Sequence, residues 1–70
     1  MERTAVASTI VASIGYDVDS STLEIELANG RVYQYFGVPE ATYLDFFNSA
    51  SKGLYFNQNT KNVYACTRVM

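Results

Sequence analysis

The stretch that decides the fold is the octapeptide from residue 32 to residue 39, Val32-Tyr33-Gln34-Tyr35-Phe36-Gly37-Val38-Pro39. Its first five residues are β-branched or aromatic except for one glutamine, and such side chains suit a pleated sheet. Gly37 then frees the backbone from strand geometry. Pro39 has no N–H to lose, and its fixed φ suits the first position of a helix. The octapeptide therefore predicts the end of a strand, a turn and the start of a helix.

Three further segments have the pattern of strands. Residues 22–27 alternate aliphatic and acidic side chains, the period of an antiparallel strand with one face on a core. Residues 8–18 and 63–69 also alternate, and Gly15 is expected at a β-bulge in the first of them. Residues 1–7 have no such pattern, and we expect them to be frayed.

The loop Ala28-Asn29-Gly30 joins the strand at residues 22–27 to the strand of the octapeptide. Its length decides which way the side chains of Tyr33 and Tyr35 point. A two-residue loop pairs Ile25 with Gln34 and turns Tyr33 and Tyr35 toward solvent. A three-residue loop with Gly30 as a bulge pairs Ile25 with Tyr33 instead, and both loops are common. Burying the Gln34 amide without a partner would cost about 1–3 kcal/mol. We therefore favour the three-residue loop, which buries both tyrosines.

Helical spacing follows the octapeptide. Residues 39–50 are predicted to form a helix, and residues 51–60 a short second one. The core-facing stripe of the first helix has the spacing i, i+3, i+4, i+7 and consists of Tyr43, Phe46, Phe47 and Ala50. The fold class is α+β. We expect a single domain over residues 1–70, with a three-strand antiparallel meander and a C-terminal strand packed on one helix and a short second helical segment.

The composition excludes most kinds of catalytic site. The chain has one cysteine and no histidine, so an internal disulfide is impossible, and Cys66 lacks its usual activating base. Cys66 is expected to be a small core residue. Glu24 and Glu26 could form a carboxylate pair, but their spacing is more typical of the solvated face of a strand. We expect no enzymatic activity, no cofactor and no metal.

Cysteine usage and hydropathy also bear on location. A lone thiol is typical of a reducing compartment, so a cytoplasmic protein is expected. No signal peptide is recognisable, and no apolar run approaches the roughly 20 residues of a membrane span. The sequence thus predicts no membrane partner.

The final third of the chain differs from the rest in charge. Residues 46–70 carry three cations and no acid, while the whole chain has a net charge of −2. This segment mixes cations, rings and amides, the side chains that bind single strands or peptides. The candidate binding residues are Lys52, Tyr55, Asn57, Gln58, Lys61 and Arg68. The more ordinary alternative is an amide-rich loop whose rings fill the core.

Several motifs recur in an order that resembles a known family. They are Ile14-Gly15-Tyr16-Asp17, the alternating Leu23, Ile25 and Leu27, Asn29-Gly30, Tyr33-Gln34-Tyr35, Gly37-Val38-Pro39, Ser51-x-Gly53-x-Tyr55-Phe56-Asn57, Tyr64 and Arg68. Together they resemble the KTSC family over about residues 8–68. This small module is found at the C-terminus of some lysyl-tRNA synthetases and alone in short bacterial and phage proteins. The chain departs from the family pattern at Ala65-Cys66-Thr67, and at Thr60, where an aliphatic residue is usual.

The resemblance implies a small α+β domain with two alternative functions. One is an accessory module that binds RNA or single-stranded DNA weakly. The other is a protein-interaction or self-association domain in a phage or mobile-element setting. The first rests on the attachment to a tRNA synthetase, which is an association and not a mechanism.

Overall fold

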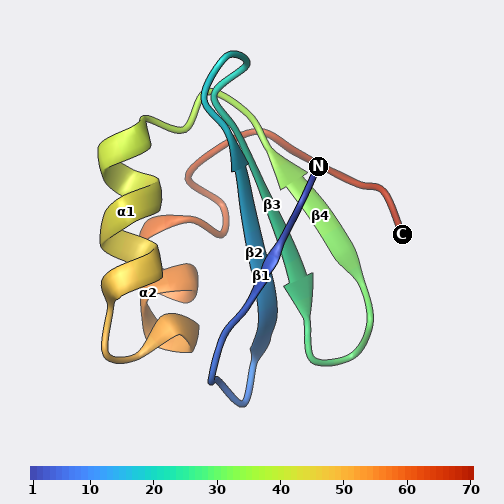
Figure 1. Cartoon of the computed structure of the whole chain (residues 1–70), viewed down its shortest axis with the longest axis vertical. Helices are drawn as coiled ribbons and strands as arrows, with labels where there is room; N and C mark the ends of the chain where they lie inside the picture. The colour runs from blue at the N-terminus through green and yellow to red at the C-terminus, as the bar shows by residue number, and fades with distance from the viewer.

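Five strands form one antiparallel sheet in the computed structural model, which describes residues 1–70, and two helices cover one face of the sheet (Figure 1). The elements in chain order are β1 (Thr4–Ala5), β2 (Val11–Asp17), β3 (Thr22–Leu27), β4 (Val32–Tyr35), α1 (Glu40–Asn48), α2 (Lys52–Asn59) and β5 (Cys66–Arg68). The strands lie in the sheet in the same order as in the chain. The predicted α+β class is confirmed, with five strands in place of the four expected.

The additional strand lies in the segment that was expected to be frayed. Thr4 pairs with Ile14 and Ala5 pairs with Ser13, so β1 forms one edge of the sheet. A strand of two residues has too few positions to show a strand period in the sequence. Its pairing depends on contacts with residues far along the chain.

The β3–β4 hairpin adopts the register of the three-residue loop. Ile25 lies opposite Tyr33, and Leu23 lies opposite Tyr35. Gly30 has a φ of +88°, the left-handed backbone that this loop requires and that glycine adopts without strain. This confirms the predicted register, which directs both tyrosines toward the helices.

The core fills the space between the sheet and the helices. Its buried members are Val11, Ile14, Leu23, Ile25, Tyr35, Val38, Phe46 and Phe56. Phe46 of α1 is fully buried and stacks on the Tyr55 ring of α2, with 5.5 Å between ring centroids. Ala50 was expected in the same stripe but is exposed, because α1 ends at Asn48 and the backbone of Ser49 is extended.

The C-terminal segment also differs from its prediction. The last strand covers only Cys66–Arg68 rather than residues 63–69, since the chain turns between α2 and β5 with Asn62 at a φ of +64°. Cys66 is exposed and not a core residue. β5 is the other edge of the sheet, where a small side chain has few neighbours to cover it.

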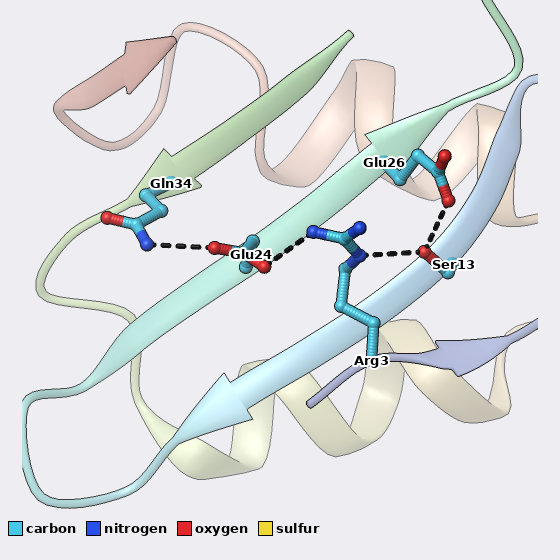
Figure 2. Close-up of polar contacts among 5 residues, drawn as sticks. All are labelled: Arg3, Ser13, Glu24, Glu26 and Gln34. Carbon is cyan, nitrogen blue, oxygen red and sulfur yellow. Dashed lines mark hydrogen bonds and ion pairs between the residues drawn. The ribbon is translucent and has the colours of Figure 1, made fainter. Parts of the chain in front are cut away.

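A polar network lies on the sheet face away from the helices (Figure 2). Glu24 accepts hydrogen bonds from Arg3 Nη1 at 2.6 Å and from Gln34 Nε2 at 2.8 Å. Ser13 Oγ accepts one from Arg3 Nε at 3.1 Å and donates one to Glu26 at 2.8 Å. Glu24 is only 6% exposed, so the expectation of a solvated carboxylate is wrong for this residue. The alternation of side chains along β3 could not show that Arg3, 21 residues earlier in the chain, covers the Glu24 carboxylate.

Gly15 makes room for this network. A Cβ atom at Gly15 would lie 2.5 Å from the carbonyl oxygen of Glu2 and 3.0 Å from Cγ of Arg3. The missing side chain therefore lets the N-terminal segment cross β2 and brings Arg3 to Glu24. The predicted bulge is not at Gly15, because the β2–β3 register shifts between Val11 and Ser13.

Tyr35→Ala should lower the free energy of unfolding by about 3–5 kcal/mol, as large-to-small substitutions in a core do. Tyr35 is 4% exposed, and its ring meets Phe56 edge-on at 5.9 Å. Urea denaturation measures the change. Phe36→Ala is the matched control, because that neighbouring ring is 41% exposed and its loss should be much smaller. Equal losses in the two variants would contradict the burial of Tyr35.

Thr60→Val should raise the free energy of unfolding by about 1 kcal/mol, since it removes a buried hydroxyl without a partner. Thr60 is fully buried after the end of α2, and its Oγ1 has no hydrogen-bond partner. Thermal and urea denaturation test the prediction. Thr60→Ser keeps the hydroxyl and loses the methyl group, so it should be less stable than the parent. A destabilised Thr60→Val variant would show that the hydroxyl is solvated or bonded.

Glu24→Gln should lower stability at pH 7 by about 1.5–3 kcal/mol, the usual contribution of hydrogen bonds to a charged group. Burial opposes ionisation of Glu24, but hydrogen bonds from Gln34 and Arg3 and the Arg3 charge outweigh it, so its pKa lies below the ordinary value of 4.5. The stabilisation is therefore present above pH 4.5 and is lost as the pH falls through the folded-state pKa.

Urea denaturation at pH 7 and pH 3 tests this pH dependence. The difference between the parent and Glu24→Gln should shrink at pH 3, because Glu24 of the unfolded chain binds a proton below its ordinary pKa of 4.5 while the folded state disfavours that proton. Asp45→Asn, at an exposed carboxylate of α1, is the control and should show a smaller effect at pH 7. A difference that is the same at both pH values would mean that the charge on Glu24 contributes nothing.

Candidate functional site

A groove of about 310 Å³ opens on the helix side of the sheet, where the β3–β4 hairpin, the end of α2 and β5 meet. Its lining residues are Leu27, Asn29, Arg31, Tyr33, Tyr35, Phe56, Lys61, Asn62 and Cys66. We call this the hairpin groove. Its size falls at the lower end of the range for small-molecule sites, about 300–1,000 Å³.

Three aromatic rings form the apolar part of the hairpin groove. Tyr35 and Phe56 are 4% and 5% exposed, so they belong to the core and form the floor. Tyr33 is half-buried, and its ring centroid lies 6.5 Å from that of Tyr35 at a tilt of 42°. Both tyrosines were expected to be mostly buried, and both are, although Tyr33 keeps part of its surface exposed. Tyr33 packs on the core with part of its ring and lines the groove with the rest.

The hydroxyl of Tyr35 stays protonated over the whole neutral range. Burial, together with the neighbouring Cys66 and Tyr33, raises the pKa of Tyr35 to about 12. A neutral phenol can donate a hydrogen bond to an acceptor in the groove. This group therefore adds a donor, and no negative charge, to the floor.

The rim of the hairpin groove is cationic and rich in amides. Arg31 and Lys61 line it from two sides, and no aspartate or glutamate is among the lining residues. Arg68 of β5 lies opposite Tyr33 in the sheet, and opposite residues of antiparallel strands share a face. Asn29 uses its Oδ1 to accept the Arg31 N–H at 2.9 Å, which leaves its NH₂ group to donate. The site can thus attract an anion and offer amide hydrogen bonds.

The structure separates the six candidate residues of the final third of the chain. Lys61 lines the hairpin groove, and Arg68 lies beside it. Asn57 and Gln58 are exposed on α2. Tyr55 is stacked on the core and directs its hydroxyl to the Thr42 carbonyl at 3.4 Å.

The sixth candidate, Lys52, lies in a different place. It is at the start of α2, and its Nζ donates to the Ser49 carbonyl at 3.1 Å. It lines a second groove of about 240 Å³ between the loop before β2 and the start of α2. That groove has no aromatic ring and no other cation. Close packing shapes it, because a Cβ atom at Gly53 would lie 2.6 Å from Cδ1 of Ile10.

The predicted binding residues include only one of the nine residues that line the hairpin groove, Lys61. Arg31, Tyr33 and Asn29 come from the hairpin, whereas the absence of acids and the mixture of cations, rings and amides favoured the final third of the chain. A signal was present, because Arg31 directly precedes β4 and lies two residues before Tyr33, so the two side chains share a face of the extended chain. Asn62 gave no comparable signal, since its place depends on the turn after α2.

Other kinds of site have less support. No group of three or more histidine, cysteine or acidic side chains is placed to hold a metal ion. Neither helix has the length or the apolar character that crossing a membrane requires.

Comparisons with known proteins agree on one family. The profile of the KTSC domain matches residues 7–64. An uncharacterised protein from Stutzerimonas stutzeri is 36% identical over 58 residues, which are 83% of this chain and 82% of that protein. A lysine–tRNA ligase from Nostoc punctiforme is 36% identical over 55 residues, which are 79% of this chain but only 10% of the ligase.

The architecture agrees with a solved structure as well. The crystal structure of a KTSC domain protein from Yersinia pestis superimposes with a TM-score of 0.96 at 38% identity, covering 99% of this chain and 97% of that one. The resemblance of the motifs to this family is therefore confirmed over most of the sequence and in three dimensions. The chain belongs to the KTSC domain family.

Proposed function

We propose that this protein is a non-enzymatic binding module that takes single-stranded nucleic acid, RNA or single-stranded DNA, in the hairpin groove. The observation that carries the proposal is an aromatic floor under a cationic rim that contains no acid. This combination suits a ligand that has both flat rings and negative charge. Nucleic acid with unpaired bases is such a ligand.

Each part of the groove has a chemical role in this proposal. The exposed part of the Tyr33 ring can stack with a base, an interaction that contributes about 1–3 kcal/mol per base and tolerates any sequence. Arg31 and Lys61 can neutralise phosphate oxygens. The amides of Asn29 and Asn62 can form hydrogen bonds to the edges of an unstacked base.

The distribution of charge between the two faces of the sheet also supports binding of an anionic ligand in the hairpin groove. The whole chain has a net charge of −2, but Glu24 and Glu26 lie on the opposite face of the sheet. Arg3 neutralises Glu24 there and holds Ser13, which binds Glu26. A polyanion therefore meets a positive rim on the groove side, whereas the other face has two carboxylates, Glu24 and Glu26, and one cation, Arg3. The local field, and not the net charge, favours association.

Two further observations favour binding over catalysis and RNA over other polyanions. The lining of the hairpin groove contains no histidine and no carboxylate, so it offers Cys66 no general base. One relative is a lysine–tRNA ligase, whose name states an RNA substrate. That second support is an analogy between proteins and adds weight only beside the geometry.

Short single-stranded RNA should bind weakly. The slope of log K against log salt concentration should be about −2, because each phosphate contact of a single strand contributes roughly −0.7 to the slope and three cations lie at the groove. Fluorescence anisotropy of labelled oligonucleotides at several salt concentrations measures this slope. Lys61→Ala should weaken binding several-fold. Lys52→Ala removes the same charge outside the groove and should change binding little.

Two outcomes would contradict the proposal. Equal effects of Lys61→Ala and Lys52→Ala would mean that the ligand senses only the overall charge. Flat titrations at high protein concentration and low salt would exclude nucleic acid and would leave the protein-interaction or self-association alternative.

A further inference from the structure

We infer that the hairpin groove is a single-nucleotide site, which takes one unpaired nucleotide with its base on Tyr33 and its phosphate between Arg31 and Lys61. The inference rests on the proposed function and narrows its ligand. It means that the protein recognises a strand end or an isolated unpaired base and does not follow a long strand.

The number of available rings is the first argument. Tyr35 and Phe56 are buried and fixed edge-on to each other at 5.9 Å, so neither offers a free face. Tyr33 alone among the aromatic lining residues is not fully buried, and part of its ring faces the groove. One partly exposed ring can stack with no more than one base, whereas binders of longer single strands place successive bases on successive aromatic side chains.

The volume of the groove is the second argument. About 310 Å³ is near the minimum for a small-molecule site, which runs from about 300 to 1,000 Å³. Two segments line the groove and close it on two sides. The hairpin contributes Asn29 and Arg31, and the turn after α2 contributes Lys61 and Asn62. This space fits one nucleotide and excludes a stacked run.

The positions of the cations are the third argument. The chain has five cationic residues, and two are engaged elsewhere. Arg3 is 2.6 Å from Glu24 on the opposite sheet face, and Lys52 is bonded to Ser49 at the far end of α2. The other three are at the hairpin groove or beside it.

No cationic track therefore leads away from the site. Proteins that bind extended strands combine stacking with a charged groove that covers about 4–16 nucleotides per domain. Here a second or third phosphate can reach Arg68, but the two remaining cations, Arg3 and Lys52, lie away from the groove. Additional nucleotides should then add almost no affinity. Bases inside a duplex are stacked and paired, so they cannot enter the groove.

The test compares ligands of increasing length on the intact chain. The ligands are a nucleoside 5′-monophosphate, a trinucleotide, a single strand of twelve nucleotides and the blunt duplex of that strand. Binding is measured by calorimetry and by protection of Cys66 from iodoacetamide, because this only cysteine lines the groove and is exposed. Cys66 reports occupancy of the groove without any substitution.

We expect the monophosphate to protect Cys66 and to compete with the strand. Affinity should rise from the trinucleotide to the twelve-nucleotide strand by no more than about fourfold. This is the ratio of the numbers of nucleotides that can occupy the single site in the two ligands. The duplex should not protect Cys66. Tyr33→Leu should abolish protection by all single-stranded ligands and Tyr33→Phe should retain it, while Lys61→Ala weakens it without altering the core.

Different failures identify different errors. A strand that binds more than about tenfold tighter than the trinucleotide, with the monophosphate inactive, would overturn the single-nucleotide site and leave nucleic-acid binding intact. Protection by the duplex equal to that by the strand would also overturn it. If no ligand binds, including the long strand, both the proposed function and this inference are wrong.

Discussion

The left-handed backbone at Gly30 sets the register on which both faces of the sheet depend. Because side chains alternate along a strand, a slip of one residue would turn Tyr33 and Tyr35 to the open face and put Gln34 into the core. The three-residue loop prevents this slip, since its bulge needs a φ that glycine adopts freely. With this register Tyr35 completes the core and Tyr33 borders the groove.

The same register organises the open face of the sheet. Gln34 lies opposite Glu24, which lies opposite Gly15, and the missing side chain at Gly15 lets Arg3 reach across. Glu24 therefore has a partner for each of its oxygens although it is almost buried. An unpaired carboxylate at such a site would be strongly destabilising. The sheet thus keeps its acidic network apart from the cations of the groove side.

Local patterns predicted most of the fold, because alternation, helical spacing and the Asn29-Gly30 turn act within a few residues. Both helices and the register of the hairpin could be predicted in this way. The errors concern contacts between distant segments. The burial of Glu24 depends on Arg3, and the exposure of Cys66 depends on its place at a sheet edge. For the same reason only Lys61 and Arg68 of the predicted site lie at the groove.

The groove exists because the sheet extends beyond the helices that cover it. Phe56 near the end of α2 reaches Tyr35, but the helix ends at Asn59 and leaves Tyr33 with only part of its ring covered. An apolar residue after α2 could complete the core over Tyr33. The chain has Lys61 and Asn62 there, polar side chains that are better solvated than buried. Because this polar turn covers Tyr33 only in part, a ring, a cation and an amide lie at a single place. The core around Phe46 supports the stability of the domain elsewhere.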